Sequence, residues 1–436
     1  MVSGSDERAS DVTARLAREF GVAVREGHSA ANVGDADVVV FSSAVRQTNP
    51  EIVEAQRRGI PVIRRAEMLA ELMRLRFGIA VAGSHGKTTT TSMVALALER
   101  AGLDPTAVIG GRLSAFGSTS RLGRGQYMVA EADESDRSFL MLSPSIAVIT
   151  NIDREHMENY GSFMDLQQAF TDFANKVPFY GSVIACADDP HLAQILPRLT
   201  RRARTYGLEN PSTYIGGVDV ELGSFGARCT VVRRAGAHTE RLGVLELAVP
   251  GRHNLRNALA VVAVADELGL GFDRVSGALA EFQGAERRFQ RLGEVGGVLV
   301  VDDYGHHPTE IAAVLDAARV TLGRRLIVVF QPHRFTRTRQ LMNEFGPSLR
   351  EADEIVLTDI YSAGEEPIDG VNVDALAQAV RLGSGRPTHV VRTLGDVAPL
   401  VAGMVRPGDA VITLGAGSIS ALAPQLLALL SERRSA

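Results

Sequence analysis

Residues 79–93 constrain the fold more than any other stretch, because they join a short apolar run to a helical pattern through two glycines and a lysine. The sequence there reads Ile-Ala-Val-Ala-Gly-Ser-His-Gly-Lys-Thr-Thr-Thr-Thr-Ser-Met. The apolar run has the length of a buried parallel strand, and the helical pattern continues to Arg100, with a stop signal at Gly102. Gly83 and Gly86 therefore lie at a strand-to-helix turn, which predicts an α/β fold with a parallel sheet.

This turn has the chemistry of a phosphate-binding loop. Its glycines let the backbone approach a phosphate, and the first amide N–H groups of the helix point at the anion. Lys87 would reach the outer phosphates as a solvated cation, and Thr88 would offer a hydroxyl to a metal ion. The loop has two residues between its glycines where the usual P-loop has four, so a structural glycine turn is the alternative. Lys87 and Lys176 are the two lysines of the sequence, and one of them stands where a P-loop needs it, which favours nucleotide binding.

The composition excludes several classes of protein. A net charge of −5 and no arginine stripe interleaved with aromatics argue against nucleic acid as a partner. Cys186 and Cys229 are too few for a disulfide framework and have no metal-ligand spacing. No apolar run reaches the 18 or more residues of a membrane span, and the first residues lack the pattern of a signal peptide. We expect a cytoplasmic protein without a membrane partner.

Short apolar runs alternate with helical patterns along most of the chain, as in parallel α/β sheets. At 436 residues the chain is long enough for two to four domains, and three is the best fit. The expected strands and strand-rich stretch cover residues 38–41, 61–63, 79–82, 127–130, 146–150, 214–249, 299–301, 326–330, 355–358 and 410–414. We place the domains at residues 1–76, 77–284 and 285–436.

Two polar segments follow expected strands of the central region and favour a divalent cation. Residues 131–136, Glu-Ala-Asp-Glu-Ser-Asp, place four carboxylates directly after a strand, where the ligand crevice of a parallel sheet lies. Glu131 could hold Mg²⁺ together with Thr88; the alternative is an acidic solvated loop. His156 follows the next strand and could reach the same crevice, although a lone histidine is more often a surface residue. A histidine ligand indicates that Mn²⁺ is accepted as well.

Residues 250–258, Pro-Gly-Arg-His-Asn-Leu-Arg-Asn-Ala, begin a helix after a turn. His253, Asn254 and Asn257 offer an amide-rich face suited to a purine edge, although asparagine as a helix cap is the simpler reading. Arg287 and Arg288 lie near the second domain boundary, where a cation could reach over a nucleotide. The alternative is a solvated arginine pair.

Two more strand ends in the third region carry polar loops. Residues 302–308, Asp-Asp-Tyr-Gly-His-His-Pro, and residues 331–337, Gln-Pro-His-Arg-Phe-Thr-Arg, each follow an apolar run. The planar guanidinium groups of Arg334 and Arg337 suit bidentate recognition of a carboxylate or phosphate. Two consecutive strand ends of this kind predict a site for an anionic substrate.

Together these motifs resemble the Mur ligases of peptidoglycan synthesis, over about residues 2–427, and within that family the branch that adds L-alanine. The family's short glycine loop also explains the unusual spacing. The resemblance implies a UDP-sugar-binding and Rossmann-like first domain, a P-loop ATPase-type central domain and a Rossmann-like third domain for the amino acid. It implies that the carboxylate of UDP-N-acetylmuramate attacks the γ-phosphoryl group of ATP and that L-alanine attacks the resulting acyl phosphate, with Mg²⁺ required.

The resemblance also implies a role for each motif residue. The triphosphate and its metal would be held by Gly83, Ser84, His85, Gly86, Lys87, Thr88 and Thr89, with Glu131 and His156 as further metal ligands. The rest of the nucleotide would be surrounded by His253, Asn254, Asn257, Arg288, Asp303 and His306. The amino acid and the sugar carboxylate would be faced by Tyr304, His333, Arg334 and Arg337. The residues expected to take part in catalysis are Lys87, Glu131, His156, Arg334 and Arg337.

The sequence departs from the family pattern in two places. Ser418 stands where the family usually has aspartate. Family members begin with a strand, a glycine-rich loop and a helix before the segment found here at residues 3–6, so we expect weak binding of the UDP-sugar and association through exposed strand edges, in a monomer or weak homodimer. The alternatives are an inactive nucleotide-binding homologue and a peptidoglycan-recycling ligase that joins a whole peptide to the muramate.

Overall fold

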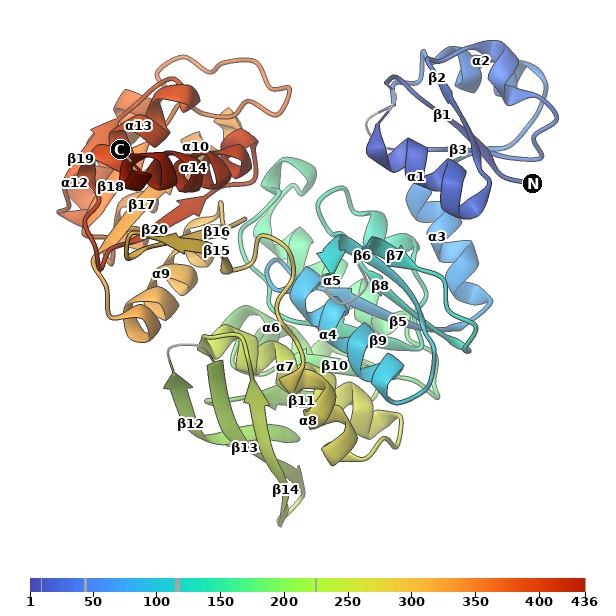
Figure 1. Ribbon diagram of the computed structural model, residues 1–436. Coiled ribbons are helices and arrows are strands. Elements are labelled where there is room, and N and C mark those ends of the chain that lie inside the picture. Colours follow the sequence, from blue (N-terminus) through green and yellow to red (C-terminus); the bar gives the residue numbers. More distant parts are fainter. Residues whose placement is uncertain (9, 43–44, 114–117, 224–225, 436) are drawn as a thin grey trace.

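Most strands belong to one of two large sheets in the computed structural model, which describes residues 1–435 except 9, 43–44, 114–117 and 224–225. A ten-stranded sheet carries the middle of the chain and a six-stranded sheet the C-terminal third, and each is covered by helices. Two further sheets of two strands each lie near the N-terminus. The predicted α/β class with mainly parallel sheets is confirmed (Figure 1).

The N-terminal part contains two small parallel sheets, β1 with β2 and β3 with β4. Its elements are β1 (Ser3–Asp6), α1 (Asp11–Phe20), β2 (Ala23–Glu26), the 3-10 helix η1 (Ala30–Val33), β3 (Val39–Phe41), α2 (Pro50–Arg57), β4 (Val62–Arg64) and α3 (Arg65–Arg74). Ala70 and Met73 of α3 are buried, and Met73 packs against Gly78, so α3 joins this part to the central one. Among the described residues, no strand pairs one small sheet with the other.

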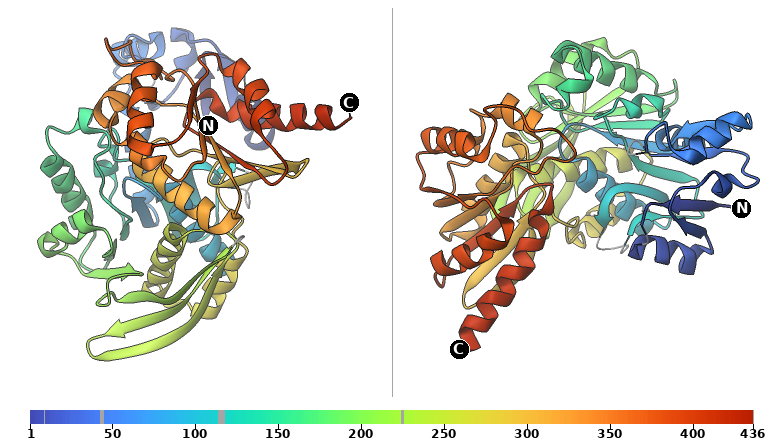
Figure 2. Two further views of the ribbon diagram at one scale, coloured as in Figure 1. Left: turned by 90° about the vertical axis from the view of Figure 1, so that its left-hand side faces the viewer. Right: turned by 90° about the horizontal axis from the view of Figure 1, so that it is seen from above.

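The central part is built around β5, which lies between β8 and β9 in the order β14-β13-β12-β11-β10-β9-β5-β8-β6-β7. Its strands are β5 (Phe77–Ala82), β6 (Thr106–Leu113), β7 (Ser118–Arg121), β8 (Tyr127–Glu131), β9 (Ile146–Ile149), β10 (Ser182–Cys186), β11 (Ala203–Gly207), β12 (Ile215–Gly223), β13 (Gly226–Ala235) and β14 (His238–Leu247). Its helices are α4 (Lys87–Arg100), η2 (Ser138–Met141), η3 (Met157–Asn159), α5 (Phe163–Asn175), α6 (Pro190–Ile195), η4 (Leu196–Arg198), α7 (Arg252–Glu267) and α8 (Phe272–Ala280). The expected strand-rich stretch forms the antiparallel strands β12–β14, which extend from the sheet in the left view of Figure 2.

The C-terminal part is doubly wound, with separate apolar cores on the two faces of its sheet. The strand order is β15-β16-β20-β17-β18-β19, with β15 as an antiparallel edge that the sequence did not indicate. Its strands are β15 (Gln290–Val295), β16 (Val298–Asp303), β17 (Leu326–Phe330), β18 (Glu354–Leu357), β19 (Thr388–Val390) and β20 (Ala410–Leu414). Its helices are α9 (Pro308–Leu322), α10 (Phe335–Leu341), α11 (Phe345–Ser348), α12 (Val373–Ser384), α13 (Leu394–Met404), η5 (Ser418–Ala421) and α14 (Leu422–Ser435).

The loops that carry the motifs leave the carboxyl ends of parallel strands in both large sheets. In the central part they follow β5, β8 and β9, and in the C-terminal part they follow β16 and β17. The carboxyl ends of parallel strands are where ligands bind in open α/β sheets. In the part of the chain that the structure describes, no helix has the length and apolarity needed to cross a membrane.

Candidate functional site

The phosphate loop after β5 is shaped by glycines and held by the loop after β9. Gly83 and Gly86 have φ values of +132° and +81°, which favour glycine. A Cβ atom on Gly86 would also lie 2.8 Å from Oδ1 of Asn257. Thr150 and Asn151 donate side-chain hydrogen bonds of 2.6 and 3.0 Å to the carbonyl oxygen of His85. The loop after β9 therefore holds the phosphate loop at His85.

Lys87 lies folded back on its own loop. Its Nζ donates to the carbonyl oxygens of Gly83 and Ser84, at 2.7 and 3.1 Å, and to Oε1 of Glu134 at 2.9 Å. Burial by itself lowers the pKa of Lys87, but the charge of Glu134 and neighbouring carboxylates outweighs it and raises the pKa well above its ordinary value. The expectation of a solvated cation is wrong, because the side chain is only 14% exposed. Glu134 lies in the acidic motif, where no local pattern distinguishes it from the neighbouring carboxylates.

Two of the three expected metal ligands lie together. The hydroxyl of Thr88 donates to both oxygens of Glu131, at 3.0 and 3.2 Å, and the backbone N–H of Gly110 donates to Oε2 of the same carboxylate. His156 instead groups with Glu134 and Glu155, and the possible ligand atoms of these three all lie within 4.8 Å of one another. Thr88 and Glu131 thus form one oxygen-rich position, and His156 belongs to a neighbouring one.

This chemistry fits a divalent cation. Oε1 of Glu155 is buried without a hydrogen-bond partner, whereas Oε2 of Glu134 lies 2.9 Å from Nζ of Lys87. Buried carboxylate oxygens without donors are costly, and a cation would satisfy them. Hard oxygen ligands suit Mg²⁺, and the imidazole of His156 extends the range to Mn²⁺.

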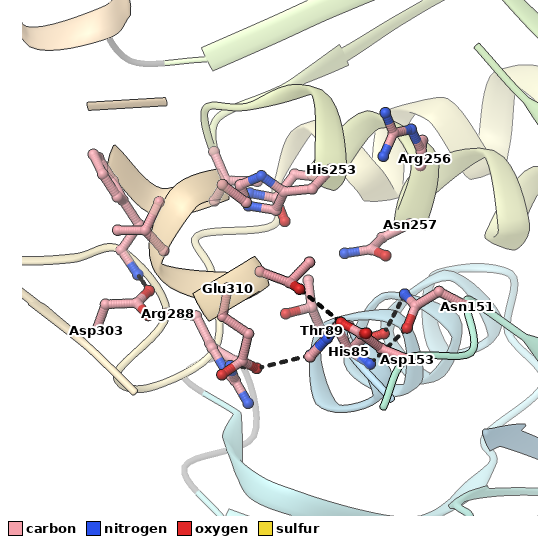
Figure 3. A pocket seen from close by; sticks show the side chains of 18 of the residues that line it. His85, Thr89, Asn151, Asp153, His253, Arg256, Asn257, Arg288, Asp303 and Glu310 are labelled. Atoms are coloured by element: carbon pink, nitrogen blue, oxygen red, sulfur yellow. Dashed lines mark hydrogen bonds and ion pairs between the residues drawn. The ribbon is translucent and has the colours of Figure 1, made fainter. Parts of the chain in front are cut away.

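A cavity of about 380 Å³ lies between the central and C-terminal parts (Figure 3). Its central-part wall includes His85, Gly86, Thr89, Asn151, Asp153, His253, Asn254 and Asn257, and its C-terminal wall includes Arg288, Asp303, Thr309 and Glu310. Apolar side chains complete it, among them Ile152, Val249, Phe282 and Val314. A concave site with apolar walls and a few polar groups is typical of a small-molecule pocket.

The polar residues at the start of α7 have different structural roles. Asn254 donates through Nδ2 to the carbonyl oxygen of Pro250 at 2.7 Å, so this amide stabilises the turn. The alternative of an asparagine helix cap is wrong, because the N-cap of α7 is Gly251 and no side chain caps this helix. Asn257 faces the phosphate loop at Gly86. Burial lowers the pKa of His253 to about 4, so its imidazole is neutral at pH 7. His253 and Asn257 are therefore the residues of this motif that line the cavity with free polar groups.

Asp303, the last residue of β16, organises the loop that faces the cavity. It accepts backbone hydrogen bonds of 2.6 Å from Phe289 and Gly305, and burial raises its pKa to about 6 although Arg288 opposes the shift. Arg288 lies 5.2 Å over the ring of Tyr304 and 3.4 Å from Glu310. Burial also lowers the pKa of His306 to about 4. The expected Arg288 and Asp303 line the cavity, whereas His306 lies beside Glu310 and is not among the described residues that line it.

Arg334 and Arg337, after β17, differ in their partners. Arg334 has a φ of +73° and pairs with Glu158 of the central part at 2.8 Å and with Glu365 at 3.1 Å. Arg337 is 9% exposed and its Nη1 contacts Nδ1 and the carbonyl oxygen of His333 at 3.3 and 3.4 Å. Within the described ranges, Arg337 pairs with no carboxylate. It is a buried cation that lacks a counterion.

The side chain of Arg337 lies beside the ring of His333 and lines a small pocket that also includes Glu155, Glu158 and Arg334. Burial, with the charges of His306 and Arg337, lowers the pKa of His333 to about 3. The ring of His333 stacks on Tyr361, with centroids 5.5 Å apart, and lies 5.7 Å from the ring of His306. At the other sequence departure, Ser418 exchanges hydrogen bonds with the side chain of Gln331, so a serine is accommodated there.

Sequence reasoning missed a polar cluster that joins the phosphate loop to the C-terminal part. Its members are Asp153, His307, Thr309 and Glu310, gathered around His85. Burial by itself lowers the pKa of His85, but Glu155, Asp153 and Glu310 outweigh it and raise the pKa to about 10. The residues come from loops far apart in the sequence, and the only local signal was the charged run Asp-Arg-Glu-His at residues 153–156.

Comparison with protein-family models places this geometry in a known class of enzyme. The Mur ligase family catalytic domain matches residues 1–77, the Mur ligase middle domain residues 81–265, and the Mur ligase glutamate ligase domain residues 287–417. These matches cover most of the chain. The chain belongs to the Mur ligase family.

Individual relatives show which members of the Mur ligase family this chain is similar to. A UDP-N-acetylmuramate--L-alanine ligase of Anaeromyxobacter sp. (strain Fw109-5) is 53% identical over 429 residues, which are 98% of this chain and 92% of that protein. The crystal structure of UDP-N-acetylmuramate-alanine ligase MurC from Thermotoga maritima superposes with a TM-score of 0.81 at 29% identity, and covers 100% of this chain and 94% of that one. A murein peptide ligase from Psychrobacter arcticus gives a TM-score of 0.69 at 26% identity, with 99% and 94% covered.

Proposed function

We propose that the chain is an ATP-dependent, ADP-forming UDP-N-acetylmuramate–L-alanine ligase of peptidoglycan synthesis. The observation that carries this proposal is the 53% identity, over 98% of the chain, to a relative of that name. The buried Arg337 without a counterion supports it, because such a cation suits a small carboxylate substrate. The family match over residues 1–77 does not favour the inactive nucleotide-binding alternative.

The chemistry follows from the arrangement of the cavity and the phosphate loop. A carboxylate oxygen of the muramate attacks the γ-phosphorus of ATP, and the bond to the β,γ-bridging oxygen breaks to release ADP. The amine nitrogen of L-alanine then attacks the carbonyl carbon of the acyl phosphate, phosphate leaves, and the nitrogen loses a proton. The protein has little covalent chemistry to perform, so positioning and charge neutralisation dominate.

We assign Lys87 and the backbone of the phosphate loop to the phosphates of ATP. Lys87 would exchange its contact with Glu134 for the transferring phosphoryl group. Thr88 and Glu131 would hold Mg²⁺, with His156 as a further ligand. A Mg²⁺ ion bound there would neutralise charge that develops on the phosphoryl oxygens.

We assign the cavity to the nucleoside and the C-terminal loops to the amino acid. His253, Asn257 and Arg288 would contact the nucleotide, while Asn254 and Asp303 keep the walls in shape. Arg337 would bind a substrate carboxylate beside Tyr304 and the neutral rings of His306 and His333. Arg334 would have to break its ion pair with Glu158 before it could bind that carboxylate. We therefore assign Arg334 a smaller part in substrate binding than Arg337.

We also propose the organisation that the sequence indicated. The domains are residues 1–76 for the UDP-sugar, 77–284 for ATP and 285–436 for the amino acid. The protein would act in the cytoplasm, as a monomer or weak homodimer, on small molecules and without a nucleic-acid or membrane partner. The affinity of the protein for the UDP-sugar, measured by calorimetry, tests the assignment of residues 1–76.

The experiment that tests the activity is ADP release from ATP with UDP-N-acetylmuramate, with and without L-alanine. We expect release that depends on both substrates, together with a product whose mass exceeds the sugar nucleotide by one alanyl residue. A peptide that begins with L-alanine should not replace the free amino acid. Turnover with the peptide but not with L-alanine would identify the recycling ligase instead, and ATP binding without any ADP release would identify a nucleotide-binding protein.

A further inference from the structure

Asp153 connects the phosphate loop to the C-terminal part. Its Oδ2 accepts a hydrogen bond of 2.8 Å from Nε2 of His85, in the phosphate loop, and one of 2.6 Å from the hydroxyl of Thr309, in the first turn of α9. His85 and Thr309 are 224 positions apart in the sequence by their numbers and belong to different sheets. One carboxylate oxygen therefore bridges two parts of the molecule.

On the central side, Asp153 and the phosphate loop form one unit. The backbone N–H of Asp153 donates to Oγ of Ser84 at 2.8 Å, and the N–H of Ser84 donates to the carbonyl oxygen of Asn151 at 3.1 Å. The N–H of His85 donates to Oδ1 of Asn151 at 2.8 Å. A displacement of Asp153 would thus be transmitted to residues 84–85, directly before the loop's second glycine.

On the C-terminal side, the start of α9 presents two groups to His85, the carboxylate of Glu310 and the ring of His307. Nδ1 of His85 lies 3.5 Å from Oε1 of Glu310, and its ring lies 5.1 Å from the ring of His307, tilted by 37° (Figure 3 shows the contacts of His85 with Asp153 and Glu310). Glu310 also accepts the backbone N–H of His306 at 3.1 Å, and the side chain of His307 caps α9. These groups keep the start of α9 rigid, so the hydroxyl of Thr309 is presented at a fixed place.

We propose that Thr309 is a positioning residue for phosphoryl transfer: its hydrogen bond to Asp153 docks the C-terminal part and, through His85, fixes the phosphate loop in its reactive shape. The inference rests on the proposed function. Thr309 touches no reacting atom in this role. The hydrogen bond between Thr309 and Asp153 forms only when the C-terminal part is docked. It therefore acts on the assembled site, and the phosphate loop of the undocked protein can still bind ATP.

The kinetic test uses Thr309→Val, which keeps the shape of the side chain and removes the hydroxyl. We expect kcat to fall about tenfold, which corresponds to about 1.4 kcal/mol, while the Kd for ATP without the other substrates changes less than about twofold. Thr309→Ser should restore kcat because it restores the donor. The matched control is Thr239→Val, at an exposed threonine of β14.

A double-mutant cycle tests whether Asp153 is the partner. If the hydroxyl acts through this carboxylate, Thr309→Val should cost little once Asp153→Ala is present. Fully additive effects would overturn the link. An affinity for ATP that falls in step with kcat would also overturn the link, because Thr309 would then contact the nucleotide directly. An unchanged kcat in Thr309→Val would overturn it too.

A second measurement follows docking itself and needs no turnover. Donor and acceptor dyes on Met164→Cys in α5 and Leu382→Cys in α12 report the distance between the two parts, since both side chains are exposed and the native cysteines are buried. With a non-hydrolysable ATP analogue, we expect a larger fraction of undocked molecules for Thr309→Val than for the wild type or for Thr309→Ser. Equal populations would refute the docking role. If the wild type fails to ligate L-alanine but this shift is observed, the proposed function is wrong and the docking link stands.

Discussion

Lys87 and Glu134 form a buried ion pair in which the ammonium nitrogen lies 2.9 Å from both carboxylate oxygens. The carboxylate is 1% exposed and the lysine side chain 14%. Removing one member of such a pair leaves the other as a buried charge without compensation. Lys87 therefore has two tasks, since it stabilises the phosphate loop through Glu134 and is proposed to bind the transferring phosphoryl group.

Lys87→Met should abolish ligation and should also lower the free energy of unfolding by about 3 kcal/mol, because it leaves Glu134 uncompensated. The double variant Lys87→Met, Glu134→Gln should regain most of that stability and remain inactive. Urea unfolding and ADP release measure the two effects separately. Wild-type stability in Lys87→Met would show that the ion pair contributes nothing, and ligation by either variant would remove Lys87 from catalysis.

Thr88→Val and Glu131→Gln should each raise the Mg²⁺ concentration needed for half-maximal activity, because each removes a proposed oxygen ligand or its charge. The matched control is Asp136→Asn, at an exposed carboxylate of the same acidic segment, which should titrate like the wild type. The measurement is a Mg²⁺ titration at saturating ATP. Unchanged titrations for both variants would place the ion elsewhere.

The sequence predicted the elements that rest on local patterns. The strand before Gly83, the helix from Lys87 to Arg100 and the stop at Gly102 follow from apolar length, turn glycines and the absence of helix breakers, and the structure has all three. The pairing of Thr88 with Glu131 followed from the rule that the carboxyl ends of adjacent parallel strands share one edge, and β5 pairs with β8.

The sequence could not predict contacts that depend on how two sheets face each other. The bond between Asp153 and Thr309 joins segments with no shared pattern, and the partner of Arg334, Glu158, lies in the central part. The burial of Lys87 could not be predicted either, because a polar loop is expected to be solvated and its contact with Glu134 depends on the fold. Antiparallel β15 was missed because Gln290–Val295 has no continuous apolar run.

Arg337→Lys should weaken the L-alanine-dependent step more than ATP binding, because lysine keeps the charge and loses the planar pair of donors. We expect the KM for L-alanine to rise by roughly 10- to 100-fold, the equivalent of about 1.5–3 kcal/mol for a charged hydrogen bond. Arg339→Lys, at an exposed arginine of the same helix, is the control. Equal losses for ATP and L-alanine would assign Arg337 a structural role.

The stability of the protein should decrease between pH 6.5 and pH 4 because of partly buried histidines that stay neutral in the folded protein. Burial lowers the pKa of His253 to about 4, from an ordinary value of 6.5. In this window the unfolded chain binds a proton that the folded chain does not, so the free energy of unfolding falls as the pH falls. The pKa of His85 is raised to about 10, so its contribution is fully present below pH 6.5 and does not change there.

His253→Gln should remove the share of this pH dependence that His253 contributes. At pH 5 the proton linkage of His253 amounts to about 2 kcal/mol relative to pH 7.5, so the variant should lose less stability than the wild type between these two pH values. His306 and His333 keep their own contributions in both proteins. The control is His238→Gln, at an exposed histidine of β14, which should follow the wild type. Urea unfolding without nucleotide at both pH values measures the difference, and an equal loss in wild type and His253→Gln would mean that His253 titrates normally in the folded protein.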